Sequence, residues 1–200
     1  MARPASSSGS TVWTAPARRP SRTSWRRPSP ARRSGSASTT STTCALRYPR
    51  GRDSAAGFWL DAFNYPRLIA DVFDPLRTSG RYRPKAHDLA ADTELAPFWL
   101  AAPPAVVVVI DGLFLLRAEL AGRFDLVIFL DVPFPVAARR LAQRDGARPI
   151  ERYVGASQRY FTECDPQRRA DVLIDNSELS SPRLLRSAIG RCSVGNATTS

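Results

Sequence analysis

The sequence lacks the long apolar runs, the apolar N-terminal segment and the paired cysteines that mark three large classes of protein. No apolar run approaches the roughly 18 residues that a membrane-spanning helix needs, and no apolar core follows the N-terminus as in a secretory signal. Its three cysteines, Cys44, Cys164 and Cys192, are widely spaced and form no CxxC pair. We therefore expect neither a membrane protein, nor a disulfide scaffold, nor a zinc site, and this cysteine usage fits a reducing cytoplasm.

Acidic residues are missing from the first quarter of the chain, although the whole chain contains 18 of them. Residues 1–52 hold 11 of the 29 Lys and Arg residues, all of them Arg, and carry the entire net charge of +11. The other 148 residues balance 18 basic against 18 acidic side chains. The charge pattern thus indicates a neutral domain behind a basic leader.

Large apolar residues are scarce in residues 1–44, which contain 18 Ser or Thr, eight Arg and five Pro. Neither helical nor strand periodicity is found there. Such a segment cannot bury enough apolar surface to offset the entropy lost on ordering. We therefore predict a disordered leader over residues 1–44, an α/β domain over residues 45–190 and a polar tail over residues 191–200.

Strand and helix patterns alternate from about Ala45 onwards. Three apolar, largely β-branched runs without polar alternation, at 105–110, 126–132 and 172–175, are typical of strands covered on both faces. Helical spacing is found over 65–76, 113–121, 135–144, 150–163 and 182–189. This order predicts an α/β fold with a parallel sheet and flanking helices, in which ligands bind beyond the carboxyl ends of the strands.

Two features near these strand ends suggest phosphate chemistry. Asp111 follows the first strand, where phosphoryl-transfer enzymes place a carboxylate that holds Mg²⁺, although an Asp-Gly turn after any strand has the same pattern. Arg140 and Arg144 are four residues apart and share a helix face that could clamp phosphate oxygens. A solvated helix face is the alternative for this pair.

The chain's single lysine and single histidine, Lys85 and His87, lie in one loop over residues 81–88. Tyr82 in the same loop could stack on a flat heterocycle, and His87 could hydrogen-bond to one. A merely polar loop explains the same residues. A basic pair, Arg168 and Arg169, precedes the last predicted strand of the sheet and could border an anionic ligand.

Taken in order, these segments resemble the uridine kinase family of P-loop nucleoside kinases, above all its bacterial uridine kinase-like members. The resemblance covers about residues 45–179, and its motifs are FWLDAFNY at 58–65, Tyr82 with His87, VVVIDG at 107–112, Arg144-Asp145, and RADVLI at 169–174. It implies a P-loop fold and transfer of the γ-phosphate of ATP to the 5′-hydroxyl of a nucleoside, with Mg²⁺. The carried-over residues would be Asp61 on the ribose, Tyr82 and His87 on the base, Asp111 near the metal, and Arg140 and Arg144 in a lid over the phosphates.

The phosphate-binding half of that family is missing from this chain. Family members begin with a strand, a GxxxxGK[ST] loop, a helix, and a second strand that ends in the catalytic Asp. Here no such loop is present, no lysine precedes Lys85, and no acidic residue precedes Asp53. Because the loop and its lysine hold the phosphates and the Asp accepts the hydroxyl proton, the catalytic residues stay unassigned and we expect the chain to be inactive.

The coding sequence of the leader offers an explanation for this loss. GC-rich codons permitted for residues 10–19, when read from the third base, translate as DGVDGAGKT, which contains a complete GxxxxGKT motif. In the same shifted frame, residues 22–26 can yield DELA and residues 38–44 can yield DDFHHV, similar to the family's catalytic-Asp segment. We therefore interpret residues up to about 44 as an out-of-frame translation of the missing half.

Two other functions of the leader stay open from the sequence alone. Its arginine pairs, at 18–19, 26–27 and 32–33, could form a nucleic-acid-binding arm on a non-catalytic protein, with an affinity that falls steeply with salt. An organelle-targeting presequence has a similar composition, but the five prolines disfavour the amphipathic helix that such signals need.

Overall fold

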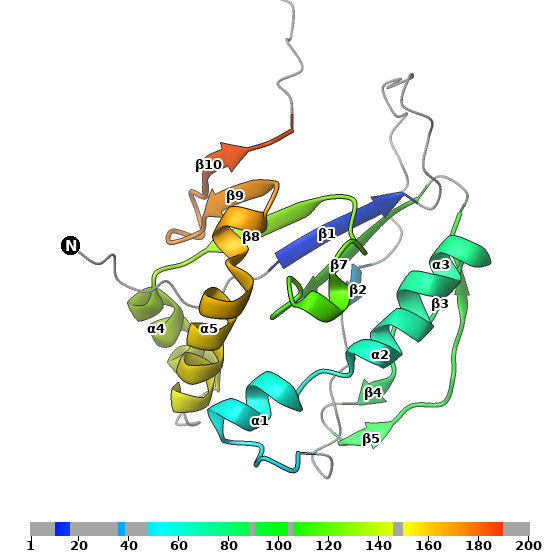
Figure 1. Ribbon diagram of the computed structural model, residues 1–200, viewed down its shortest axis with the longest axis horizontal. Coiled ribbons are helices and arrows are strands. Elements are labelled where there is room, and N and C mark those ends of the chain that lie inside the picture. The colour runs from blue at the N-terminus through cyan, green and yellow to red at the C-terminus, as the bar shows by residue number, and fades with distance from the viewer. Residues whose placement is uncertain are drawn as a thin grey trace, which may run out of the picture.

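The computed structural model describes residues 11–16, 36–38, 48–88, 91–103, 106–145 and 150–189 (Figure 1). Its main sheet has six strands in the order β10-β9-β8-β1-β7-β2. These strands are β1 (Thr11–Pro16), β2 (Ser36–Ser38), β7 (Val107–Gly112), β8 (Val127–Asp131), β9 (Val172–Asp175) and β10 (Arg183–Ser187). With the helices beside the sheet, this arrangement confirms the predicted α/β class.

Three of these strands are the ones that the sequence predicts. β8 and β9 match the runs at 126–132 and 172–175 to within one residue at each end, and β7 begins two residues later than predicted. β8 and β9 pair in parallel, with Ile128 opposite Val172 and Asp131 opposite Asp175. The carboxyl ends of β8 and β9 therefore lie side by side at one edge of the sheet.

The centre of the sheet corrects the prediction of an all-parallel sheet. β1 lies between β7 and β8 and runs antiparallel to both. β2 pairs in parallel with β7. These two segments of the leader supply hydrogen-bonding partners to backbone groups at the edges of β7 and β8. Disorder of the leader stays a prediction. The other residues of the leader lie outside the described residues, as does the whole polar tail over residues 191–200.

Two predicted helices are replaced by other structure. The segment 182–189 forms β10, which pairs antiparallel with β9 and satisfies the outer edge of that strand. The segment 113–121 contains a single 3₁₀ turn, η3 (Ala118–Leu120). Phe114 has a φ of 59°, in the left-handed region, which a continuous right-handed helix cannot contain.

The helices predicted over 65–76, 135–144 and 150–163 are present, whereas two short helices, over 55–60 and 166–169, are not predicted by the sequence. The segment predicted as a helix over 65–76 is α2 (Tyr65–Leu68), η2 (Ile69–Phe73) and α3 (Asp74–Thr78). The two long helices are α4 (Phe134–Asp145) and α5 (Ile150–Cys164), and the two short ones are α1 (Ala55–Leu60) and α6 (Pro166–Arg169). No helix of the part that the structure describes is long and apolar enough to cross a membrane.

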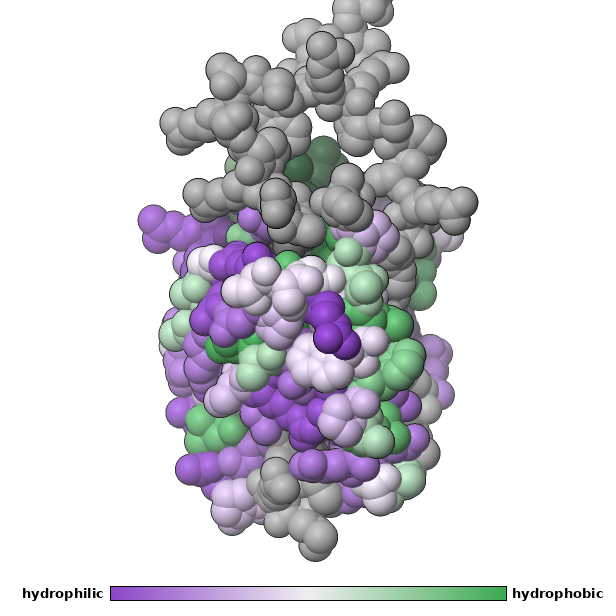
Figure 2. Space-filling model, turned by 90° about the vertical axis from the view of Figure 1, so that its right-hand side faces the viewer, coloured by the Kyte–Doolittle hydropathy of each residue, from purple (hydrophilic) through white to green (hydrophobic). Residues whose placement is uncertain are grey.

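Two small sheets flank the helices, β3 (Arg81–Tyr82) with β6 (Leu100–Ala101) and β4 (His87–Asp88) with β5 (Thr93–Glu94). They lie with α3 at the right of Figure 1. Figure 2 views the molecule from that side and shows mainly hydrophilic residues, with small hydrophobic groups between them. This part of the described surface is therefore predominantly polar.

The hydrophobic core has an aromatic cluster around Phe114, directly after β7. The ring of Phe114 lies edge-on to those of Phe58, Trp59, Phe63 and Tyr160, with centroids 5.7, 5.1, 5.9 and 5.3 Å away. Pairs of this kind are worth about 0.5–1.5 kcal/mol each beyond the area they bury. The cluster therefore fixes α1 and α5 beside the carboxyl end of β7.

Helices α1 and α5 approach each other closely at Gly155. A Cβ atom on Gly155 would lie 2.6 Å from the Cβ atom of Ala55. We predict that Gly155→Ala lowers the free energy of unfolding by roughly 1–3 kcal/mol through this overlap, although alanine favours a helix over glycine by about 1 kcal/mol. Urea unfolding measures the change. The double variant Ala55→Gly/Gly155→Ala removes the overlapping methyl group and should recover stability, whereas a Gly155→Ala protein as stable as the parent contradicts the close packing.

Candidate functional site

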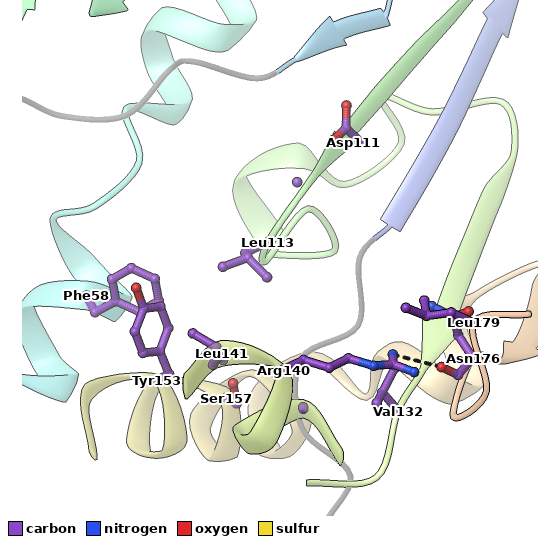
Figure 3. A pocket seen from close by; sticks show the side chains of 12 residues that line it. Phe58, Asp111, Leu113, Val132, Arg140, Leu141, Tyr153, Ser157, Asn176 and Leu179 are labelled. Carbon is purple, nitrogen blue, oxygen red and sulfur yellow. Dashed lines mark hydrogen bonds between the residues drawn. The ribbon is translucent and has the colours of Figure 1, made fainter. Parts of the chain in front are cut away.

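A cavity of about 350 Å³ lies at the carboxyl ends of β7, β8 and β9 (Figure 3). Its walls come from those strand ends and from helices α1, α4 and α5. Both the strand ends and the helices supply polar and apolar side chains to these walls. This is the edge of the sheet at which the sequence predicts a ligand site.

Asp111 and Arg140, predicted from the sequence to act on metal and phosphate, both line this cavity. Asp111 lies near the end of β7, opposite Val12 of β1 and Ser38 of β2. Arg140 lies on α4, and Figure 3 shows its guanidinium group directed toward the turn after β9. The structure therefore brings these two residues to one space.

The guanidinium group of Arg140 is already bonded within the chain. Its Nη1 donates to the carbonyl oxygen of Asn176 at 2.9 Å, and its Nη2 donates to that of Ser177 at 2.8 Å. These bonds tie α4 to the turn after β9. They use two of the five N–H donors of the guanidinium group. The side chain of Arg144, one turn further along α4, lies outside the described residues.

Asp61, predicted to bind ribose hydroxyls, directly follows α1 and does not line the cavity. Its Oδ1 accepts from Nη1 of Arg50 at 2.5 Å, and its Oδ2 accepts from the backbone N–H of Arg50 at 3.3 Å. The side chain of Asp61 is only 7% exposed. A sugar hydroxyl could therefore reach this carboxylate only if Arg50 moved away.

Tyr82 and His87, predicted to hold a base, lie in the small sheets and also do not line the cavity. Tyr82 is part of the hydrophobic core. His87 is 3% exposed, and its Nε2 lies 3.1 Å from Oδ1 of Asp92. Their role toward a base stays a prediction, because both side chains are buried within the chain.

The sequence analysis missed the aromatic end of the cavity, formed by Phe58 and Tyr153. Tyr153 and Ser157 are four residues apart on α5, so both can face the same space. That spacing was visible in the sequence. Phe58 could not have been assigned in this way, because only the packing of α1 on α5 brings it to Tyr153.

The fit of a magnesium ion depends on Asp111. Among the side chains that line the cavity, Asp111 is the one carboxylate, and no cluster of three or more His, Cys, Asp or Glu residues suited to a metal is found in the part of the chain that the structure describes. Mg²⁺ is commonly bound by one or two carboxylates together with substrate phosphates and water. The residues present therefore fit Mg²⁺ only together with a phosphate-bearing ligand.

The direction of β1 determines what else can reach the cavity. Thr11 lies opposite Gly112, and Pro16 lies opposite Val107 at the start of β7. The carboxyl end of β1 is therefore at the edge of the sheet away from the cavity.

Comparisons with known proteins give one informative similarity. No protein-family model and no curated protein matches the chain. Its structure is similar to a solved structure described as a possible uridine kinase from Bacillus stearothermophilus, with a TM-score of 0.51 and 24% sequence identity over 67% of each chain. At this identity the similarity concerns the fold alone.

The turn after β9, which carries Asn176, is held by Asp175. The carboxylate of Asp175 accepts hydrogen bonds from the hydroxyl group of Ser177 at 2.5 Å, from Nη2 of Arg183 at 2.6 Å, and from the backbone N–H of Ser177 at 2.9 Å. These bonds lower the pKa of Asp175 to about 2, and the bond from the Ser177 hydroxyl group has the largest effect.

We predict that acid weakens this turn. Because the pKa of Asp175 in the folded chain lies below the roughly 3.9 of an unfolded Asp, its ionised form stabilises the fold above about pH 4, and this contribution is lost as the pH falls towards 2. Urea unfolding gives the free energy of unfolding of the parent and of Asp175→Asn. The difference between these two free energies should become smaller as the pH falls over this range. Glu163→Gln, which removes an exposed carboxylate that pairs with Arg159 on α5 and not with this turn, is the control. A difference that is constant over this pH range contradicts the prediction.

Proposed function

We propose that this chain is a uridine kinase-like protein, built on the scaffold of an ATP- and Mg²⁺-dependent nucleoside kinase. The observation that carries the proposal is the cavity at the carboxyl ends of β7, β8 and β9, where Asp111 and Arg140 line one space. The similarity of the fold to a structure described as a possible uridine kinase supports it. The motifs of residues 45–179 support it from the sequence.

The reaction of such a scaffold is transfer of the γ-phosphate of ATP to the 5′-hydroxyl of a nucleoside. A bond forms between the 5′-oxygen and the γ-phosphorus, the bond from that phosphorus to the β–γ bridging oxygen breaks, and a base takes the hydroxyl proton. Asp111 would hold Mg²⁺ together with the phosphates, and Arg140 and Arg144 would neutralise them. Asp61, Tyr82 and His87 would hold the nucleoside, once Arg50 has left Asp61.

We further propose that the 200-residue chain does not perform this transfer. The sequence contains no GxxxxGK[ST] loop, and its single lysine lies at position 85. β1 runs in the direction that takes its carboxyl end away from the cavity. β2 does bring Ser38 opposite Asp111, but residues 38–44 contain no carboxylate that could accept the hydroxyl proton. Phosphate binding and proton removal are therefore both missing.

A coupled assay of ADP release tests the proposal. With ATP, Mg²⁺ and uridine or cytidine, we expect no nucleoside-dependent turnover by the 200-residue chain. A matched protein, in which residues 10–44 are replaced by the translation of the shifted frame, should gain turnover because it regains the loop and the base. Turnover by the 200-residue chain contradicts its inactivity. A folded but inactive shifted-frame protein contradicts the kinase scaffold.

Peptide mapping by mass spectrometry tests the origin of the leader. We expect the protein from its native cell to yield peptides with the GxxxxGKT motif, because the shifted frame restores the family's missing half. Peptides that match residues 11–50 of the sequence would instead show that the leader is translated as it stands. The kinase relationship would then be one of ancestry only.

A further inference from the structure

A second cavity, of about 140 Å³, lies at the opposite edge of the sheet from the first. Val127, the first residue of β8, and Arg169, which precedes β9, both line it, so it lies at the amino ends of these two parallel strands. Residues of the segment 115–124, which returns the chain from β7 to β8, form its other walls. The residues that line the two cavities are different, so the second cavity lies outside the site proposed for phosphate transfer.

Two arginine side chains line the second cavity. Arg117 and Arg169 are its charged side chains among the described residues, and both are positive. Burial raises the pKa of the Cys164 thiol, while the charges of Arg169 and Arg117 oppose that rise, so the two guanidinium groups lie near the same side chain. The charged part of this wall is therefore suited to an anion.

Arg117 is already paired with a carboxylate of the chain. Its Nε and Nη2, which form one edge of the guanidinium group, donate to Oε2 and Oε1 of Glu119 at 3.2 and 2.5 Å. Its Nη1 donates to the carbonyl oxygen of Trp59. Two parallel bonds of this kind are the preferred geometry between arginine and a carboxylate.

The same edge of Arg169 has no such partner. Its Nη1 donates to the carbonyl oxygens of Leu116 at 2.9 Å and Cys164 at 3.4 Å, which fixes the side chain at the cavity. Within the part of the chain that the structure describes, Nε and Nη2 make no hydrogen bond and Arg169 forms no ion pair. The neighbouring carboxylate of Asp171 accepts instead from the backbone N–H of Val127 at 2.7 Å.

The segments outside the described residues contain neither Asp nor Glu. They therefore supply no acidic side chain that could pair with the open edge of Arg169. A carboxylate for this edge would come from another molecule.

The rest of the wall is mainly apolar. Leu120 is 1% exposed, and Phe124 and Val127 line the cavity with it. Such a surface favours a ligand that carries hydrocarbon next to its charged group. A volume of about 140 Å³ is well below the ~300–1,000 Å³ of sites for drug-sized ligands, so the cavity has room for a small molecule only.

We propose that the second cavity binds a small organic carboxylate with an apolar tail. The carboxylate accepts from Nε and Nη2 of Arg169, as Glu119 accepts from Arg117, and the tail lies against Leu120 and Phe124. Of the basic pair that the sequence singles out, Arg169 lines the cavity and Arg168 does not. Because this site is at the other edge of the sheet, the inference goes beyond the proposed function and does not depend on it.

Nuclear magnetic resonance titration of the isotope-labelled 200-residue chain tests the inference, with the amide signals of residues 115–124 as the readout. Isovalerate is the probe, and acetate, isoamyl alcohol and inorganic phosphate are compared with it. We expect isovalerate to bind at least about fivefold more tightly than acetate, because its tail buries apolar surface. It should bind at least about tenfold more tightly than isoamyl alcohol, which has the tail without the charge.

Two variants test the charge and the space separately. Arg169→Gln should weaken isovalerate binding at least about tenfold, because the charge-assisted bonds are lost. Arg168→Gln removes the same charge from the adjacent residue of α6 and is the matched control, with an expected change of less than about twofold. Ala121→Leu keeps both arginines and places a larger side chain at the cavity, so it should also weaken binding.

Circular dichroism checks the fold of each variant, and Ala121→Leu decides the question if Arg169→Gln does not fold. The absence of isovalerate binding would overturn the inference, as would equal binding of acetate. Tighter binding of phosphate than of isovalerate would indicate an inorganic anion site and would also overturn it. Unchanged binding in Arg169→Gln or Ala121→Leu would place the ligand elsewhere. None of these results contradicts the kinase scaffold, which is judged by turnover of the shifted-frame protein.

Discussion

The sheet depends on the pairing of β1 with both β7 and β8. β7 and β8 are not neighbours in the strand order, because β1 lies between them and pairs with both. Without it, each would present an unpaired edge whose backbone groups need partners. β7 leads into the aromatic cluster around Phe114, and β8 leads into α4. The walls of the cavity are therefore held in position by a strand of the Ser- and Thr-rich leader.

The direction of β1 explains why the cavity has the chemistry that it has. Because Pro16 lies opposite Val107, the carboxyl end of β1 is at the far edge of the sheet. The cavity is then formed by β7, β8, β9 and the helices alone, and its side chains are aromatic, aliphatic and hydroxylic, with one carboxylate and one bonded arginine. The proposed loss of phosphate transfer rests in part on this arrangement.

Sequence patterns predicted the elements whose side chains are buried and missed those held by backbone pairing. The run 172–175 was predicted to the residue because strands packed within a sheet are apolar without interruption. Every residue of β10 is exposed, so its sequence carries no strand pattern, and the spacing of its apolar residues predicts a helix instead. In the site, Asp111 and Arg140 were predicted because each follows from a local motif. Phe58 and Tyr153 meet only through the packing of α1 on α5, which no local pattern contains.

Nuclear magnetic resonance of the labelled chain tests the central claim, the reversed strand between β7 and β8, most directly. In an antiparallel pair, directly opposite residues approach closely along the whole register. We expect contacts between Thr11 and Gly112 at one end and between Pro16 and Val107 at the other. Contacts of Thr11 with Val107 and of Pro16 with Gly112 would show a parallel strand. That result would direct the end of β1 towards the cavity and contradict the account.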